Sequence, residues 1–589
     1  MNDYKEGDFV DHSKSTISYQ DFINKELVQF SRYDLMRSVP SVMDGLKPTQ
    51  RKVLFSCFKR NLRSDAKVAQ LVGYIGEHSA YHHGESSLSS TIVSMAQDFV
   101  GSNNVNLLVP SGQFGTRASG GKDSASARYI YTRLSPITRL IFSPLDDAVL
   151  DYQMEEGQKI EPYWYAPIIP MVLVNGAEGI GTGWSTSVPN YDPRELIANM
   201  RLFIKKSKMK SMKPWYRGFS GTIKPAEEKG KYECVGVHHK TSSTMLQITE
   251  LPLKKWTQDY KEFLHTLLPG SEKRGKLQVH DVREYHTENK VHFEVRMDAA
   301  KLKGLEEGEG IDAAFRLRGT VSETNMVMFD SEGKIKKYKD VLEIMAEFAK
   351  IRLEMYEVRK KYLIDKLTLE KELLANRARF ISMIVAKTLH VNNRKKADLV
   401  KDLIRLKFRK FGDTAPPRTG YEYLLVMQIQ TLTAERKLEL ERILKAKTAE
   451  LNDLTKTTVE QLWVRDLDAL EASLTKLYSA DTEGDAAVTG SRGKKRKANE
   501  IDGQGSLKAA KPRGAGARGR RSKGGRGRGR GQAIEEDEEE EAAGEQTGEN
   551  VEEVDDLGEN LFADVQRWTA GYLKGPSGLS SFRGKKQRR

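Results

Sequence analysis

Apolar positions change their spacing along the chain, and these changes divide it into regions of different predicted structure. Residues 18–150 mix helical patterning with polar turns, and Pro48 precedes an amphipathic basic helix, the place that proline favours at a helix start. Residues 151–337 become strand-like, and the runs 168–174 and 245–249 have the composition of strands. We therefore expect an α+β fold of several domains in this part of the chain.

From residue 338 to 478 the pattern becomes strongly helical. Apolar residues recur at alternating spacings of three and four, which is the seam of a coiled coil, and a second seam is interrupted by Lys447. Because an insert at about 380–430 separates the seams, we predict an antiparallel coiled coil with a tip domain; an ordinary helical bundle is the alternative. The first seam comprises Val341, Ile344, Phe348, Ile351, Met355, Val358 and Tyr362, and the second Leu440, Leu444, Leu451 and Leu454.

Charge dominates residues 479–589. A basic cluster at 492–497 and an arginine–glycine tract at 518–530 precede an almost purely acidic stretch at 535–559. Blocks of like charge bury too little apolar surface to order a chain, so we predict a disordered tail. The basic cluster is typical of a nuclear localisation signal and the arginine–glycine tract of loose nucleic-acid binding, although a solvated charged tail is the alternative. Residues 1–17 are predicted to be an N-terminal extension.

Length and charge narrow the class of protein. The chain has 589 residues, too many for one core, and a formal net charge of +14. That balance favours a polyanionic partner, either nucleic acid or an anionic membrane surface. A run of eighteen or more apolar residues does not occur, so we expect no membrane span. Two cysteines, Cys57 and Cys234, exclude a disulfide framework or a cysteine-rich zinc site and fit a reducing compartment.

A tyrosine directly after an arginine, Arg128-Tyr129, lies in a segment of small residues. A tyrosine hydroxyl can attack phosphorus and keep the product as a phosphotyrosine ester. A phenol with a pKa of about 10 is a poor nucleophile at neutral pH, so it needs help. A neighbouring guanidinium favours the phenolate and holds a phosphate oxygen. Alone the pair proves little, because most tyrosines simply pack or form caps.

Several further motifs surround this pair. In chain order the set is DGLKPTQRK at 44–52, YHHGE at 81–85, GSNN at 101–104, GQFGTR at 112–117, the Arg-Tyr pair, and NGAEGIGTGW at 175–184. Together and in this order these motifs resemble the type IIA DNA topoisomerases, with the order found in the eukaryotic enzymes. The resemblance covers residues 18–478.

The resemblance implies a reaction centre of Tyr129, Arg128, His83 and Arg37. Tyr129 would attack a DNA phosphate, and the cations would stabilise charge on the phosphoryl oxygens. Two chains would each link one tyrosine to a 5′ phosphate, opening a staggered double-strand break. A second duplex passes, and the break reseals with the energy kept in the phosphotyrosine bond. The activity implied is that of an ATP-dependent isomerase acting on double-stranded DNA.

The resemblance also implies a set of DNA contacts. Basic residues of the DGLKPTQRK segment would meet the backbone from a winged-helix element, although a solvated helix face is the plain alternative. Ile180 would wedge between base pairs and bend the duplex. The residues implied to bind DNA are Lys47, Arg51, Lys52, Gln113, Arg117 and Ile180.

The architecture implied is a winged-helix cleavage domain at 18–150, an α/β tower at 151–337, and a coiled coil with a dimer gate at 338–478. Residues 421–425 resemble the gate region, through which the chain would form a homodimer. The family's ATPase and TOPRIM modules are not found in the sequence, since no EGDSA, PLRGK or DxDxD segment occurs. Mg²⁺ and ATP are therefore expected to bind outside this chain, on a partner protein, as in gyrase, or on a missing region, and no metal site is expected here.

Two other interpretations remain open. One is a non-catalytic DNA-binding scaffold derived from the same fold, which should have lost the nucleophile or its cations. Tyr129, Arg128, His83 and Arg37 are all present, which argues against it. The other is a truncated piece of a longer enzyme. The resemblance further implies a nuclear protein with a role in chromosome segregation.

Overall fold

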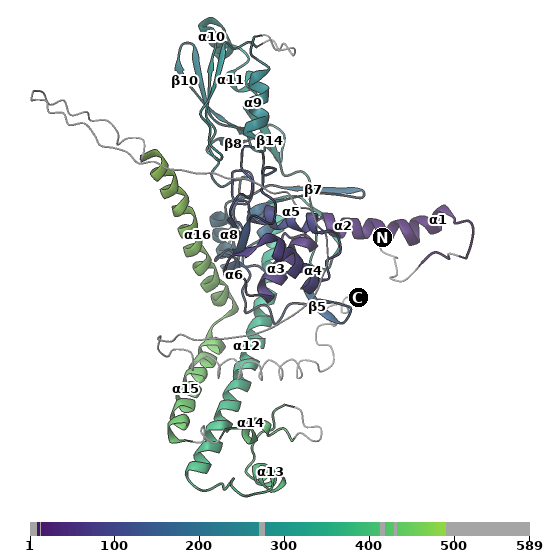
Figure 1. Cartoon of the computed structure of the whole chain (residues 1–589), viewed down its shortest axis with the longest axis vertical. Helices are drawn as coiled ribbons and strands as arrows, with labels where there is room; N and C mark the ends of the chain where they lie inside the picture. Colours follow the sequence, from purple (N-terminus) through teal and green to yellow (C-terminus); the bar gives the residue numbers. More distant parts are fainter. Residues whose placement is uncertain (1–8, 12, 270–276, 413–418, 429–432, 491–589) are drawn as a thin grey trace, which may run out of the picture. The chain divides into compact units, whose positions relative to one another are not determined.

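The computed structural model describes residues 9–11, 13–269, 277–412, 419–428 and 433–490, with side chains up to residue 479 (Figure 1). The chain divides into two compact units. Residues 1–392 and 428–480 form the first unit, and residues 393–427 and 481–589 belong to the second. Within the described ranges, no helix is both long enough and apolar enough to cross a membrane.

The first unit begins with helices and one small sheet. The helices are α1 (Tyr19–Asp21), η1 (Phe22–Leu27), α2 (Val28–Ser38), α3 (Pro48–Lys59), α4 (Val68–Ser79) and α5 (Glu85–Ala96). The antiparallel sheet has the order β1 (Ala66–Lys67), β3 (Tyr131–Leu134), β2 (Leu108–Ser111). The predicted helix start is confirmed: Pro48 is the first residue of α3, and the Gln50 side chain accepts from the Lys47 amide at 2.9 Å.

The next elements lead to a hairpin that is important for the site. They are α6 (Thr138–Ile141), β4 (Tyr152–Glu155), β5 (Gln158–Pro162), α7 (Met171–Asn175), β6 (Ala177–Gly181), β7 (Trp184–Val188) and α8 (Pro193–Ile204). The strand predicted at 168–174 is wrong, because residues 171–175 form the short helix α7. Its residues 171–174 are all buried, and a continuous apolar run suits a buried helix as well as a strand.

A second hydrophobic core lies between residues 246 and 317. Its antiparallel sheet has the order β10 (Val237–Ser242), β11 (Met245–Glu250), β13 (Phe293–Arg296), β12 (Asp281–Glu284), so the strand predicted at 245–249 is confirmed. The helices of this part are α9 (Thr257–His265), α10 (Ala299–Glu307) and α11 (Ile311–Ala314). Flanking it are a sheet of β14 (Arg318–Ser322), β9 (Lys231–Val235) and β8 (Thr222–Pro225), and a hairpin of β15 (Met326–Phe329) and β16 (Ile335–Tyr338).

The first hydrophobic core crosses the predicted boundary at residues 150 and 151. It contains Val53 and Ile75, continues through Ile169 and Met200, and includes Met326 beyond the second core. The boundary was predicted from a change in periodicity, which reports local structure. Packing is decided by contacts between distant segments, so the two need not coincide.

Two long helices of the first unit, α12 (Val341–Val385) and α15 (Ala434–Lys456), lie side by side (Figure 1). They run antiparallel, because Lys360 of α12 donates to the Thr457 carbonyl at 2.7 Å, while Glu370 pairs with Lys447 at 3.4 Å. The predicted interruption of the second seam at Lys447 is thus an ion pair with the facing helix. Residues 393–427, most of the predicted insert, belong to the second unit, and the coiled coil with a tip domain stays a prediction.

The predicted first seam is only partly correct. Val341, Ile344 and Phe348 are buried, but Ile351, Met355, Val358 and Tyr362 are not fully buried. Arg352, Tyr356 and Arg359 are buried there instead. The charged groups are accommodated because Arg352 pairs with Asp146 at 2.8 Å and Arg359 with Asp466 at 2.9 Å. This stretch of α12 therefore packs against the first core rather than along a coiled-coil seam.

Helix α16 (Val459–Gly490) continues past the predicted start of the tail, so the prediction of disorder is wrong for residues 479–490. The predicted nuclear localisation cluster, arginine–glycine tract and acidic stretch lie outside the described residues. Residues 9–11 and 13–17 of the predicted extension form no helix or strand.

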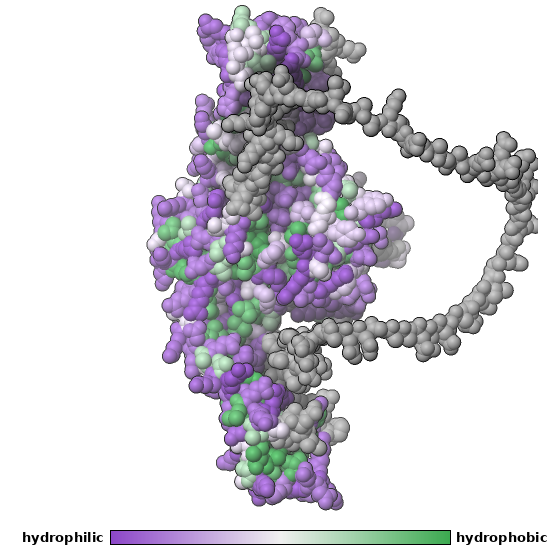
Figure 2. Space-filling model, turned by 60° about the vertical axis from the view of Figure 1, so that its left-hand side comes forward, coloured by the Kyte–Doolittle hydropathy of each residue, from purple (hydrophilic) through white to green (hydrophobic). Residues whose placement is uncertain are grey.

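The described part of the second unit contains α13 (Lys396–Arg405) and α14 (Glu422–Leu425). Leu399, Leu403 and Leu424 are buried, and the Tyr421 hydroxyl donates to the Phe408 carbonyl at 3.2 Å. Hydrophilic residues cover most of the face shown in Figure 2, with smaller hydrophobic areas between them. Such a surface is expected of a chain in which 30% of residues are charged.

Candidate active site and nucleic-acid interface

Tyr129 lies in a loop, residues 113–129, that we call the Tyr129 loop. Its side chain is 71% exposed. The Tyr129 amide donates to the Ser126 carbonyl at 2.9 Å, which closes a tight turn. Among the described residues, the Tyr129 hydroxyl has no hydrogen-bond partner and the Arg128 guanidinium forms no ion pair. The nucleophile predicted from the sequence is therefore accessible.

The Tyr129 loop is held against the N-terminal end of α4. The amide of Val68 donates to the Ile130 carbonyl at 3.0 Å, and the amide of Ala69 donates to the Ala127 carbonyl at 3.1 Å. The first amides of a helix have no partner within the helix, so they are free to make such bonds. They hold the backbone on both sides of Tyr129.

Hydrogen bonds within the Tyr129 loop, and from the residue that follows α5, restrain the loop further. The Ala125 amide donates to the Gln113 carbonyl at 2.9 Å. Thr116 donates to the Asp123 carboxylate through its amide, at 2.8 Å, and its hydroxyl, at 2.6 Å. Gln97 donates to the carbonyls of Phe114 and Gly121, at 2.9 and 3.3 Å. The Gln113 side chain itself is exposed and available to a ligand.

His83 lies in a group of aromatic and cationic residues between α4 and α5. Its Nε2 is 2.5 Å from the Tyr33 hydroxyl, and the Tyr81 ring meets it edge-on with centroids 5.5 Å apart. Burial, then the positive charge of Arg37, and then smaller effects of His82 and Lys52 lower the pKa of His83. The structure therefore brings Arg37 and His83 together, with His83 favoured as the neutral imidazole.

The predicted reaction centre is not assembled within one chain. Ile130, next to Tyr129, is bonded to the first residue of α4, whereas His83 lies four residues beyond Ser79, the last residue of the same helix. A helix rises 1.5 Å per residue, so the two ends of this 12-residue helix are about 17 Å apart. Tyr129 and Arg128 are at one end, and His83 and Arg37 are at the other.

Two of the predicted DNA-binding cations are internal instead. The guanidinium of Arg51 is buried and pairs with Asp44 at 2.7 Å, which corrects the expectation of a cation facing DNA. Lys52 donates to the Ser79 carbonyl at 2.5 Å and pairs with Glu161 at 3.0 Å. Burial raises the pKa of Glu161. Both side chains bond to other parts of the protein: Arg51 to the segment before α3, and Lys52 to the end of α4 and to β5.

Arg117 is a third correction. Its side chain is buried and pairs with the buried Glu250 at the end of β11. Lys47 differs, because it is only partly buried and donates to the Glu178 carbonyl at 2.7 Å. Burial lowers the pKa of Lys47. Of the cations expected to contact DNA, Lys47 and Lys52 keep partly exposed side chains, whereas those of Arg51 and Arg117 are buried.

Ile180 projects from the hairpin of β6 and β7, residues 177–188, which we call the wedge hairpin. Its side chain is 85% exposed. The hairpin rests on α2, where a Cβ on Gly179 would lie 2.0 Å from the Ser38 carbonyl oxygen. The amide and hydroxyl of Thr182 both donate to Asp34, at 2.7 and 2.8 Å. Contacts with α2 thus fix the position of the wedge hairpin, while the apolar side chain of Ile180 stays exposed.

Sequence reasoning did not select four residues of this region, Tyr33, Asp34, Glu178 and Lys254. The helical spacing of four between Tyr33 and Arg37 could have indicated that both face His83. Lys254 could not have been found, because its ion pair with Glu178 joins residues 76 positions apart. Such a contact leaves no local pattern.

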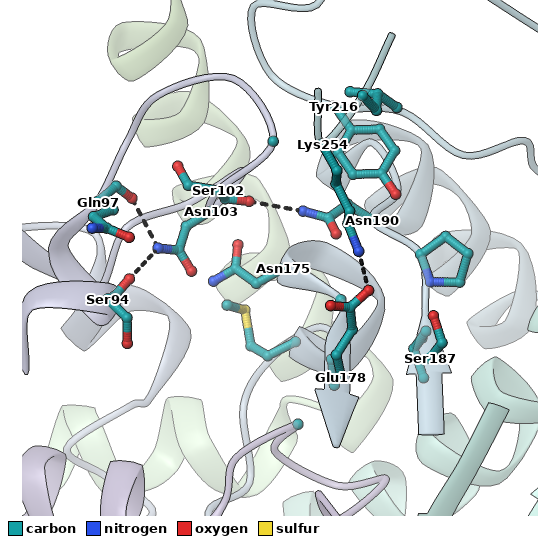
Figure 3. Close-up of a pocket in the computed structure, with 18 of the residues that line it drawn as sticks. Ser94, Gln97, Ser102, Asn103, Asn175, Glu178, Ser187, Asn190, Tyr216 and Lys254 are labelled. Atoms are coloured by element: carbon teal, nitrogen blue, oxygen red, sulfur yellow. Dashed lines mark hydrogen bonds and ion pairs between the residues drawn. The ribbon is translucent and has the colours of Figure 1, made fainter. Parts of the chain in front are cut away.

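A polar cavity of about 580 Å³ lies at the base of the wedge hairpin. Figure 3 shows the Lys254–Glu178 pair on one side and Asn103 on the other. Asn103 donates to the carbonyls of Ser94 and Gln97, at 2.7 and 2.8 Å, so its amide nitrogen is occupied by the protein. Within the described ranges, no three His, Cys, Asp or Glu side chains lie close enough to hold a metal ion.

Comparisons with known proteins match most of the chain. The family described as the A subunit of DNA gyrase/topoisomerase IV matches residues 37–468. DNA topoisomerase 2 of Plasmodium falciparum is 46% identical over 497 residues, covering 80% of this chain and 35% of that protein. DNA topoisomerase 2 of Arabidopsis thaliana is 44% identical over 531 residues, covering 84% and 36%. The chain thus spans about a third of the length of these relatives.

A solved structure is also similar. It is the crystal structure of the Plasmodium falciparum topoisomerase II DNA-binding, cleavage and re-ligation domain. The TM-score is 0.75 and the identity 46%, and the match covers 82% of this chain and 68% of that one.

Proposed function

Because the chain belongs to the family of the DNA gyrase/topoisomerase IV A subunit, we propose that it is the breakage-reunion part of a type IIA DNA topoisomerase. The observation that carries the proposal is Tyr129, an exposed phenol after an arginine, held by backbone bonds to α4. The finer architecture proposed is a winged helix around α3 and α4, a tower built on the second core, and a coiled coil of α12 and α15 that carries a dimer gate.

The proposed reaction exchanges one phosphoester for another. The Tyr129 oxygen attacks the phosphorus and loses its proton, while the bond from phosphorus to the 3′ oxygen breaks and that oxygen takes up a proton. The product is a 5′-phosphotyrosine and a free 3′ hydroxyl, and the reverse reaction reseals the strand. Arg128 stabilises the phenolate and the phosphoryl oxygens. No net bond energy is lost, so resealing needs no ATP.

The separation of Tyr129 from His83 supports a homodimer. One chain would supply Tyr129 and Arg128, and a second chain would supply His83 and Arg37 to the same phosphate. His83 would donate a hydrogen bond to a phosphate oxygen, and Arg37 would pair with its charge. Two such composite centres would cut the two strands of one duplex.

Duplex DNA would be held by the exposed groups of the site. We propose Lys47, Gln113 and Ile180 as contacts, with Ile180 entering a base step and bending the duplex. Arg51, Lys52 and Arg117 act within the protein instead.

Mg²⁺ and ATP are proposed to bind outside this chain, on a TOPRIM and an ATPase part supplied by a partner or by another region. When bound, the metal would neutralise charge on the phosphoryl oxygens. The described residues do not fit such a site, because they contain no group of three His, Cys, Asp or Glu side chains that could hold a metal ion. The eukaryotic relatives and the basic cluster at 492–497 support a nuclear protein that acts in chromosome segregation.

Trapping of covalent protein–DNA adducts with denaturant tests the proposal, in cells that naturally express the chain. Wild type and Tyr131→Phe should form adducts through a 5′ phosphate, and Tyr129→Phe should form none. Tyr131 is a matched control because it is also exposed and lies two residues away. Equal adducts from Tyr129→Phe, or none from chromatin-bound wild type, would contradict the proposal and favour a non-catalytic scaffold.

Complementation tests the composite centre. Tyr129→Phe and His83→Ala, each inactive alone, are expressed together. A mixed dimer then contains one centre with an intact Tyr129 and an intact His83, so single-strand adducts should return. If both residues act within one chain, every centre of the mixed dimer stays defective and no adduct appears.

A further inference from the structure

We propose that residues 250–258 couple bending of DNA at Ile180 to the position of Tyr129, with Lys254 and Glu250 as positioning residues. This inference rests on the proposed function. The segment, which we call the coupling segment, joins β11 to α9 in the second core. It contacts both the Tyr129 loop and the wedge hairpin, which have no ion pair or hydrogen bond to each other among the described residues.

Glu250 connects the coupling segment to the Tyr129 loop. Its carboxylate pairs with Arg117, a residue of that loop, and both side chains are buried. The hydroxyl of Ser220 and the amide of Leu251 also donate to this carboxylate, at 2.9 and 2.8 Å. Because this charge pair is buried and the Glu250 carboxylate accepts further hydrogen bonds, its geometry is constrained, so a shift of Glu250 should shift Arg117.

Two further contacts lie beside this pair. The Gln258 amide, at the start of α9, donates to the Ala118 carbonyl at 3.0 Å. The ring of Trp256 lies against Gly120, where a Cβ would come within 2.3 Å of the ring. Gly120 also has a φ of +63°, which suits glycine. The middle of the Tyr129 loop is thus held by an ion pair, a backbone bond and an aromatic contact.

Lys254 connects the same segment to the wedge hairpin. Its ammonium pairs with the carboxylate of Glu178 on β6 (Figure 3). Glu178 and Ile180 are two residues apart on one strand, so their side chains point to the same face of the hairpin. A base step that pushes on Ile180 therefore acts on the face that carries Glu178. DNA phosphates near this face would also compete for Lys254.

The two ion pairs of the coupling segment differ in burial, and this difference suits a segment that transmits a displacement from the wedge hairpin to the Tyr129 loop. The pair of Lys254 and Glu178 is half exposed, at 50% and 61%, so it adds little to stability and can be broken by DNA. The pair of Glu250 and Arg117 is buried and holds its geometry. Packed segments of this kind move between discrete arrangements rather than deform continuously. A change at the labile end is then transmitted to the loop that carries Tyr129.

The test measures DNA bending and loop protection on the same samples, without metal or ATP. Bending is followed by energy transfer between the ends of a short labelled duplex, and protection by hydrogen exchange of the amides at 113–129. In wild type, DNA should change exchange in the loop by about tenfold. We call this DNA-induced change in hydrogen exchange at 113–129 the loop response. Ile180→Ala should lose both the DNA bend and the loop response. Lys254→Ala should keep the bend but reduce the loop response to within about twofold of the free chain.

Lys240→Ala is the matched control, since Lys240 forms a partly exposed pair with Glu306 at 2.7 Å, on β10 and α10. It should behave as wild type. Glu250→Gln should uncouple the loop as Lys254→Ala does, and Arg117→Glu with Glu250→Arg should restore part of the response.

The outcomes separate the inference from the function on which it rests. A loop response in Lys254→Ala equal to wild type, or a response in an unbent Ile180→Ala complex, overturns the inference alone. A wild-type chain that binds duplex without bending it contradicts both the inference and the proposed role of Ile180. The adduct experiment on Tyr129 is independent of either result.

Discussion

The hydroxyl of Tyr33 on α2 lies 2.5 Å from Nε2 of His83, in the segment between α4 and α5. This contact joins two parts of the candidate site and places His83 near Arg37, whose charge helps to lower the pKa of the imidazole. His83 is therefore favoured as the neutral form in the free protein, and a bound phosphate changes that balance.

DNA binding should take up a proton at His83. A phosphate beside the imidazole favours its charged form and raises the pKa that burial and Arg37 had lowered. Affinity for duplex DNA should then increase as the pH falls below about 6.5 and decrease as it rises, by up to about tenfold. Binding titrations between pH 5.5 and 8, at constant salt, measure this.

His83→Gln should remove this slope. His82→Gln is the control, because His82 is adjacent but exposed and should leave the slope in place. An identical pH dependence in His83→Gln and wild type would show that another group takes up the proton.

Arg51→Met should act on folding. The substitution leaves the buried Asp44 carboxylate without its main partner, which costs about 3–5 kcal/mol. Arg133→Met is the matched control, because Arg133 pairs with Asp65 at 2.6 Å on the surface and should cost about 0–1 kcal/mol. Denaturant unfolding compares the two variants, and equal losses of stability would contradict the burial of the first pair.

Ile180→Ala should leave stability within about 0.5 kcal/mol of wild type, because the side chain is exposed in the free protein. It should, however, lose most of the DNA bend, since a methyl group cannot fill an opened base step. Energy transfer across a labelled duplex measures the bend. Met154→Ala, at another exposed hairpin position, should bend DNA as wild type does.

The pair of Lys447 and Glu370 should show strong coupling. Lys447→Leu leaves Glu370, which is almost fully buried, without its cross-helix partner and should cost about 1–3 kcal/mol. Lys447→Leu with Glu370→Leu should recover this loss, because an apolar pair replaces a buried ion pair well. Lys445→Leu, at an exposed position on the same helix, is the control. A double variant less stable than either single one would contradict the predicted coupling.

Local patterns predicted the elements that local chemistry decides. Pro48 marked the start of α3, the run at 245–249 marked β11, and the interruption at Lys447 marked an ion pair with Glu370 of the facing helix. The order of the motifs indicated the family and selected Tyr129. These features can be predicted from the sequence because each depends on residues that are close together along the chain.

The tertiary structure alone decided which basic side chains are available to contact DNA. Lys47, Arg51 and Lys52 look alike in the sequence, but a basic residue on an amphipathic helix can face solvent or a buried carboxylate. Asp44 and Glu161 decided the outcome, and Glu161 is 109 positions from Lys52. The same holds for Arg117, whose partner Glu250 is 133 positions away.

The sequence by itself thus determined the chemistry of the chain: a tyrosine next to an arginine, an apolar residue in a glycine-rich turn, and the helices and strands that carry them. The separation of Tyr129 from His83 by the length of α4, and the coupling segment between Tyr129 and Ile180, depend on the packing of distant segments. Such contacts are the sum of many weak interactions among residues far apart in the chain, and no local pattern records them.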